Sequence, residues 1–66
     1  MNELKSIRTK LGMTQQEVSE KSGVPYAAYV AYENYYREPP VSRAIMISKA
    51  FGLPVEEIKW RDDNEE

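Results

Sequence analysis

The sequence contains neither cysteine nor histidine, and these two absences exclude many kinds of catalytic and metal site. Without cysteine the chain has no disulfide bond, no thiolate nucleophile and no zinc–thiolate site, which suits a reducing compartment. Without histidine it lacks the commonest general base and the commonest metal ligand. The three glycines are isolated from one another and form no loop that could cradle a phosphate group. We therefore expect no enzyme, no cofactor and no bound metal.

Long apolar runs are missing as well. No segment approaches the length that crosses a membrane, and the amino terminus, MNELKSIRTK, lacks the apolar stretch of a signal peptide. We therefore expect a soluble, cytoplasmic protein. Its 66 residues allow one small domain with a modest core, which a partner subunit would help to stabilise. We expect this domain to span residues 1–60 and to be followed by a disordered acidic tail, residues 61–66.

The negative charge of the chain is concentrated at its end. The net charge is −2, but residues 1–60 hold eight Lys and Arg against seven Asp and Glu, while residues 61–66 carry −3. The part of the chain that is expected to fold is therefore almost neutral. Its total charge does not exclude a surface that binds DNA.

The helical spacing of apolar residues, interrupted by glycine and proline, predicts an all-α fold with no strand. The five expected helices span residues 3–11, 15–21, 26–33, 41–51 and 54–60. Asn2 and Thr14 can cap the first two helices, and Glu17 completes a capping box with Thr14. Gly23 supplies a left-handed stop after the second helix. The segment 14–36 therefore has the form of a helix-turn-helix, two short helices joined by a tight turn.

The same spacing predicts which side chains face the core. The expected inward residues are Leu4, Ile7, Arg8, Leu11, Val18, Ser19, Tyr29, Tyr32, Val41, Ala44, Ile45, Ile47, Ser48, Phe51, Val55 and Ile58. Met13 is expected to pack against Val18 at the start of the second helix. Met46 is expected to be more exposed than its neighbours.

Taken together, these residues make the chain resemble the lambda-repressor-like helix-turn-helix domains, the Cro and phage-repressor type that is also called the XRE family. The matching segments are residues 4–8, GMTQQEV (12–18), GV (23–24), YEN (32–34), REP (37–39) and residues 47–58. The resemblance implies a compact five-helix domain in which the second and third helices form the helix-turn-helix. It also implies a sequence-specific transcriptional regulator of phage or plasmid type.

The resemblance carries roles for particular residues. It implies that Gln15 bonds a DNA phosphate at the amino end of the second helix, although a solvated helix end is the simpler alternative. It implies a partly buried ion pair between Arg8 and Glu33 that fixes the angle of the third helix. Contacts to the sugar–phosphate backbone are implied for Asn34, Arg37, Ser42 and Arg43. For Arg43 a solvated surface charge is an equally simple reading.

The third helix departs from the family where base edges are normally read. Similar proteins carry side chains that form hydrogen bonds there, whereas this chain has Pro25, Tyr26, Ala27 and Ala31, with Val30 beside them. Only Tyr26 offers a side-chain hydrogen bond. Ala27, Val30 and Ala31 could contact thymine methyl groups, and the remaining affinity would then come from phosphates.

Two functional hypotheses follow. In the first, a homodimer binds a palindromic operator with the third helix of each subunit in the major groove. Ile58 and Trp60 are then candidates for the dimer interface, unless Trp60 folds back over the fourth helix. In the second, the protein is a module of the antirepressor, modulator or antitoxin-like kind that docks on another protein. The docking residues would be Tyr26, Ala27, Val30, Ala31 and Tyr35, the last of which replaces the glycine usual after Asn34.

Overall fold

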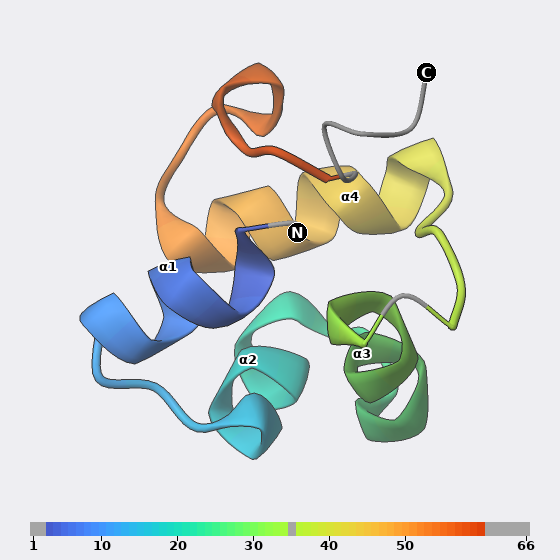
Figure 1. Cartoon of the computed structure of the whole chain (residues 1–66), viewed down its shortest axis with the longest axis horizontal. Coiled ribbons are helices and arrows are strands. Elements are labelled where there is room, and N and C mark those ends of the chain that lie inside the picture. Colours follow the sequence, from blue (N-terminus) through green and yellow to red (C-terminus); the bar gives the residue numbers. More distant parts are fainter. Residues whose placement is uncertain (1–2, 35, 61–66) are drawn as a thin grey trace.

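The computed structural model describes residues 3–34 and 36–60, so the expectations for Asn2, Tyr35 and the tail 61–66 lie outside it. The all-α class is confirmed, and four α-helices are followed by one short 3-10 helix (Figure 1). They are α1 (Leu4–Lys10), α2 (Gln15–Ser22), α3 (Tyr26–Glu33), α4 (Val41–Phe51) and η1 (Val55–Glu57). None of the helices in this part of the chain combines the length and the apolar character that a membrane crossing requires.

The prediction of a fifth helix over residues 54–60 was wrong, because only the three residues of η1 are helical. Ile58 leaves the helix with an extended backbone and buries its side chain in the core. The chain then runs beside its own beginning, where the Glu3 N–H donates to the Lys59 carbonyl oxygen at 2.9 Å. The Lys59 N–H in turn donates to the Glu3 carboxylate at 3.2 Å. After η1 the chain therefore pairs with Glu3 through Lys59 instead of forming a further helical turn.

One hydrophobic core joins the four α-helices. Its buried members are Leu4, Val18, Val24, Tyr29, Tyr32, Ile47, Phe51 and Ile58. The prediction that Tyr29 and Tyr32 are core residues is confirmed, since their exposed fractions are 0% and 3%. Partly buried side chains around this core include Met13 and Trp60.

Three residues that were expected to be buried are exposed. Leu11 is 50% exposed, Val41 is 76% exposed and Ile45 is 38% exposed. Leu11 follows the last residue of α1, where the chain turns away from the core. On α4 the buried direction is set by packing against α2 and the turn after it, so Met46 rather than Ile45 faces inward. A Cβ atom placed on Gly23 would lie 3.4 Å from the Met46 Cε, which shows how close that turn approaches α4.

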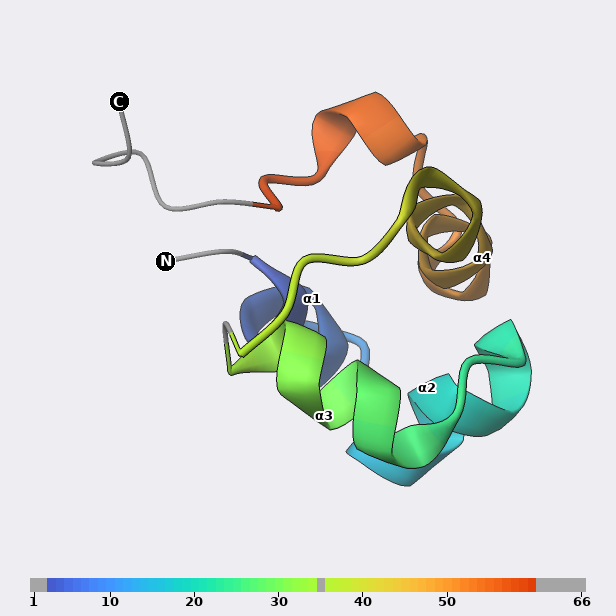
Figure 2. The same ribbon diagram turned by 90° about the vertical axis from the view of Figure 1, so that its right-hand side faces the viewer.

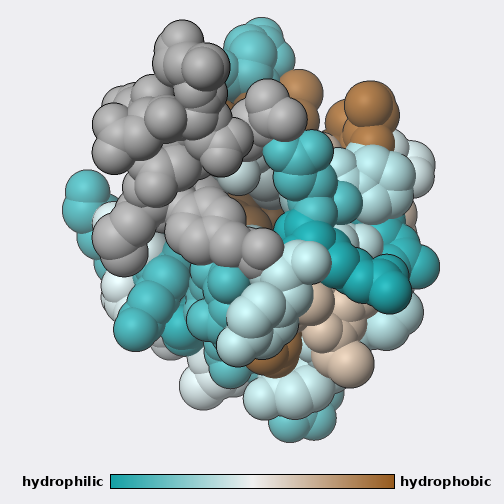
Figure 3. Space-filling model, turned by 45° about the vertical axis from the view of Figure 1, so that its right-hand side comes forward, coloured by the Kyte–Doolittle hydropathy of each residue, from teal (hydrophilic) through white to brown (hydrophobic). Residues whose placement is uncertain are grey.

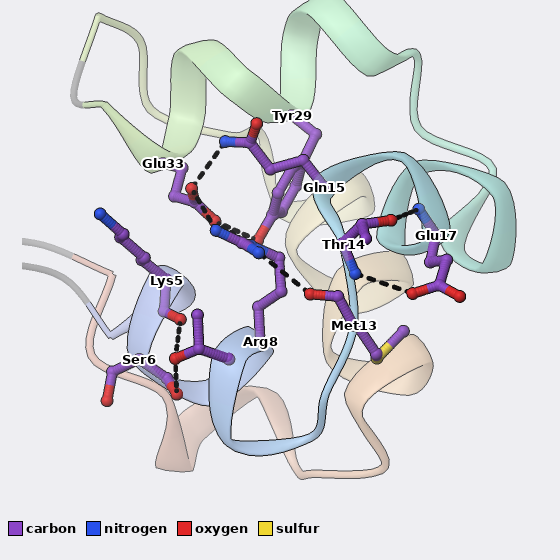
Figure 4. A network of polar contacts seen from close by, with 10 residues as sticks. Lys5, Ser6, Arg8, Met13, Thr14, Gln15, Glu17, Tyr29 and Glu33 are labelled. Carbon is purple, nitrogen blue, oxygen red and sulfur yellow. Dashed lines mark hydrogen bonds and ion pairs between the residues drawn. The ribbon is translucent and has the colours of Figure 1, made fainter.

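The helix-turn-helix is held together by local hydrogen bonds. The predicted capping box is present at the start of α2, because the Thr14 hydroxyl accepts from the Glu17 N–H and the Glu17 carboxylate accepts from the Thr14 N–H (Figure 4). Gly23 ends α2 with a φ of 80°, a conformation that other residues rarely adopt. The Ser19 hydroxyl donates to the Val24 carbonyl oxygen at 2.7 Å and fixes the turn.

The orientation of α3 is set by a buried carboxylate, that of Glu33 (Figure 4). The predicted ion pair is present, with 2.8 Å between the Arg8 Nε and the Glu33 Oε2. Arg8 also donates to the other carboxylate oxygen at 3.3 Å and to the Met13 carbonyl oxygen at 3.0 Å. The Gln15 side-chain amide donates to Glu33 at 2.7 Å, and the Tyr29 hydroxyl donates at 2.9 Å. Side chains from α1, α2 and α3 therefore meet at one charge.

These contacts perturb the ionisation of the groups involved. Burial alone would raise the pKa of Glu33, but the hydrogen bonds from Arg8, Tyr29 and Gln15 outweigh it and lower the pKa below its usual value of 4.5. The hydrogen bond to Glu33 raises the pKa of Arg8, and burial opposes that shift. Burial, followed by the hydrogen bond to the Glu33 carboxylate, raises the pKa of the Tyr29 hydroxyl. The carboxylate is thus charged, and the phenol neutral, at neutral pH.

The substitution Thr14→Ala tests the capping box. It removes the side chain that accepts the Glu17 N–H, so we expect the free energy of unfolding to fall by about 1 kcal/mol. Thr9→Ala is a matched control, because the Thr9 hydroxyl bonds only carbonyl oxygens of its own helix. We expect the control to change stability by less than about 0.5 kcal/mol. Urea unfolding followed by circular dichroism measures both, and equal losses would show that the cap contributes nothing.

The substitution Glu33→Gln tests the buried carboxylate. It leaves the Arg8 charge without its partner, and we expect a loss of about 3 kcal/mol at pH 7. Because the native pKa of Glu33 is lowered, its contribution is fully present above pH 4.5 and is lost as the pH falls through the native pKa. The difference between wild type and Glu33→Gln should therefore shrink on acidification. Glu20→Gln, at an exposed carboxylate on α2, is the control, and a pH-independent difference for Glu33→Gln would contradict the assignment.

Candidate nucleic-acid interface

One side of α3 belongs to the core and the other faces away from it. Figure 2 shows α3 at the front of the molecule, with α1 behind it. The side chains of Tyr29, Tyr32 and Glu33 are buried. Since successive residues of a helix are turned by about 100°, Ala27 and Ala31 point away from this buried side. Two of the four residues that the sequence assigned to base reading, Ala27 and Ala31, therefore lie on the outward side.

The outward side of α3 has almost no capacity for hydrogen bonds through side chains. Tyr26 is 50% exposed and Ala27 is exposed, while Val30 and Ala31 are half-buried. Of these four residues only Tyr26 carries a donor or acceptor. The space-filling view shows apolar surface in its lower part, where α3 lies, with hydrophilic side chains around it (Figure 3). The exposed surface of α3 is therefore mainly apolar.

A hollow of about 410 Å³ lies beside this side of α3. Its lining residues are Pro25, Ala27, Ala28, Ala31 and Arg37. The sequence did not assign Ala28 to the site, although its spacing of three residues from Ala31 places the two on one side of the helix. The loop after α3 brings Arg37 to the same hollow, so an exposed cation lies next to apolar surface.

The amino end of α2 is the second part of the candidate interface. Gln15 is the first residue of α2, and the N–H groups of Gln15 and Gln16 have no acceptor within that helix. The Gln15 side chain is already engaged, since its amide nitrogen donates to Glu33 at 2.7 Å. Only the second hydrogen of that nitrogen remains for another acceptor. This link between α2 and α3 is not apparent in the sequence, where the two residues are 18 positions apart.

The remaining backbone-contact candidates lie around the loop between α3 and α4. Asn34, Arg37 and Ser42 are exposed. Arg43 is half-buried, and its guanidinium donates to the Tyr32 hydroxyl at 3.0 Å. Arg43 therefore ties the start of α4 to the last turn of α3. Asn34 ends α3 with a φ of −97°, which lies outside the left-handed region.

The two candidates for a dimer interface have different environments. Ile58 is only 4% exposed and belongs to the core of the single chain. Trp60 is half-buried, and its indole N–H donates to the Val55 carbonyl oxygen at 3.0 Å. Trp60 folds back toward the start of α4 and lines an apolar groove of about 380 Å³. The other lining residues are Glu38, Pro39, Val41, Ala44, Val55 and Glu56.

The described residues contain no group of three Asp, Glu, His or Cys side chains that could hold a metal ion. The candidate surface combines three features, which are an apolar helix side, an open helix end and one exposed cation, that of Arg37. These three features lie on α3, on the start of α2 and on the loop after α3.

Comparison with known proteins assigns the chain to a family. A model of a helix-turn-helix family matches residues 4–58. The chain is 33% identical over 64 residues to an uncharacterised HTH-type transcriptional regulator of Methanocaldococcus jannaschii, with 97% of each protein covered. It is 29% identical over 62 residues to the uncharacterised HTH-type transcriptional regulator YgzD of Bacillus subtilis, with 94% of each covered. A third such regulator, from Archaeoglobus fulgidus, is 32% identical over 62 residues, which cover 94% of this chain and 89% of that protein. With the whole of α1 to η1 inside the matched range, this chain belongs to the XRE-type helix-turn-helix family.

Proposed function

We propose that this protein is a DNA-binding transcriptional regulator that places α3 in the major groove of its operator. Family membership and the names of its relatives support this proposal. The observation that carries it is the position of α3, whose inner side is fixed by the core and by Glu33 while its outer side lies open beside Arg37. The open amino end of α2 is the second anchor, since helix amino termini favour phosphate groups.

In the proposed complex, phosphate contacts supply most of the affinity. The exposed cation of Arg37 and the N–H groups at the start of α2 face the DNA backbone, as do Asn34 and Ser42. Gln15 contributes through the one amide hydrogen that Glu33 leaves available. Arg43 acts mainly by holding the start of α4 against α3. Gln15 contacts the same Glu33 carboxylate that orients α3. A DNA phosphate bound at Gln15 therefore fixes α3 relative to the DNA backbone.

We further propose that the regulator is a homodimer on a palindromic, phage-type operator. Two copies of α3 can then occupy successive major grooves on one side of the duplex. The interface is expected at the groove lined by Val41 and Trp60 rather than at Ile58, because Ile58 is already buried within one chain. Val41 is 76% exposed, which is a large exposed fraction for an apolar side chain at the start of a helix.

A second candidate function is a module that docks on another protein through α3. The observation that favours it is the apolar character of the outward side, where Tyr26 lies beside Ala27, Val30 and Ala31. Tyr36, in the following loop, is 80% exposed. Surfaces rich in tyrosine are common in protein–protein interfaces. DNA binding is the first candidate because such a module would not need the cation and the open helix end beside α3.

The substitution Arg37→Ala tests the DNA-binding proposal. If Arg37 contacts a phosphate, binding to every duplex should weaken by about tenfold at low salt, and the slope of log K against log salt should fall by about one. Lys10→Ala is the charge-matched control, because α1 lies on the side of the molecule away from the α3–α4 loop (Figure 1). Fluorescence anisotropy with labelled duplexes measures both variants. Failure of the wild type to bind any duplex at low salt would reject this function and leave protein docking.

The substitution Val41→Glu tests the dimer interface. It places a charge at the apolar groove, beside which Glu38 and Glu56 already lie, so dimer dissociation should increase by at least about tenfold. Leu11→Glu is the matched control, since Leu11 is also an exposed apolar residue but lies at the end of α1. Sedimentation equilibrium measures the dissociation constants. A wild-type protein that stays monomeric at every concentration would reject the homodimer.

A further inference from the structure

The apolar side of α3 and the cation beside it restrict the kind of DNA that the protein can distinguish. Ala27, Val30 and Ala31 offer only hydrocarbon, and they are held at fixed positions by the buried inner side of the helix. The hollow next to them has the guanidinium of Arg37 as its only charged lining group. A ligand that fits this surface presents small apolar groups close to a negatively charged backbone.

The major groove meets this description only where it contains thymine. All four bases present hydrogen-bonding groups there, but thymine alone adds an apolar group, its 5-methyl. Side chains without donors or acceptors cannot distinguish patterns of hydrogen-bonding groups. They can distinguish a methyl group, because its burial against hydrocarbon is favourable. The phosphates that border the groove complement the charge of Arg37.

We propose that α3 selects thymine-containing half-sites through contacts between thymine 5-methyl groups and the hollow lined by Ala27, Ala28 and Ala31. Val30 extends the same apolar surface, and Tyr26 adds the one side-chain hydrogen bond at its edge. The inference rests on the proposed function, since it requires α3 to enter the major groove. Beyond that function, it identifies the thymine 5-methyl as the chemical group that α3 recognises.

The experiment removes methyl groups from the DNA without changing its base pairing. A preferred duplex is first selected from random sequences with the wild-type protein. Each thymine of a half-site is then replaced in turn by deoxyuridine, which lacks only the methyl group. At one or two positions per half-site we expect the affinity to fall by about fourfold, the effect of one buried methyl group. At those positions 5-methylcytosine paired with guanine should bind like thymine, and unmethylated cytosine should bind like uracil.

A protein variant assigns the effect to α3. Ala27→Ser introduces a hydroxyl on the exposed, outward side of the helix, and we expect the ratio of affinities for thymine and uracil duplexes to fall towards one. Ala50→Ser makes the same change on α4 and should leave this ratio unaltered.

The outcomes separate this inference from the function on which it rests. If the wild type binds DNA but thymine and uracil duplexes bind equally well at every position, methyl readout is overturned and DNA binding stands. If thymine is preferred but Ala27→Ser leaves the ratio unchanged, the assignment to this part of α3 is overturned. If no duplex binds at low salt, the proposed function itself is rejected, and docking of a protein on α3 takes its place.

Discussion

The carboxylate of Glu33 is the contact on which the arrangement of the first three helices depends. These helices have only seven or eight residues each and would be unstable in isolation. Glu33 accepts hydrogen bonds from Arg8 on α1, from Gln15 on α2 and from Tyr29 within α3. A buried charge is costly unless it is fully paired, so the carboxylate favours the one arrangement that brings all three donors to it. The direction of the outer side of α3 follows from this requirement.

Much of the fold could be predicted because proline and glycine residues mark the ends of its helices in the sequence. The ranges of α3 and α4 agree with expectation, since Pro25 and Pro40 precede them and Gly52 follows α4. Which apolar residues are covered was less predictable. Helical spacing groups Val41 and Ile45 on one side of α4, but only the neighbouring elements decide whether that side is buried. The short η1 depends on the pairing of Glu3 with Lys59, residues 56 positions apart, for which no local signal exists.

In the candidate site, too, some features could be predicted from the sequence and others depend on contacts between distant residues. Resemblance to a family correctly anticipated the ion pair of Arg8 with Glu33, because both residues stand in matched segments. It did not anticipate that the Gln15 side-chain amide donates a hydrogen bond to Glu33, or that the Arg43 guanidinium donates one to the Tyr32 hydroxyl. Both facts depend on distances between side chains from different helices. They give these residues a structural role, since a group that is already bonded inside the protein helps to orient the surface.

Trp60 is the single tryptophan of the chain, and its location makes it a built-in optical probe. The indole is half-buried, bonded to the Val55 carbonyl oxygen and set in the groove beside Val41. Its fluorescence therefore responds when the carboxyl end detaches from the core and when a second molecule covers the groove. The outward side of α3 lies on a different element, so a ligand bound there does not touch the indole directly. Emission spectra can thus follow folding and association in the unlabelled protein, separately from events at α3.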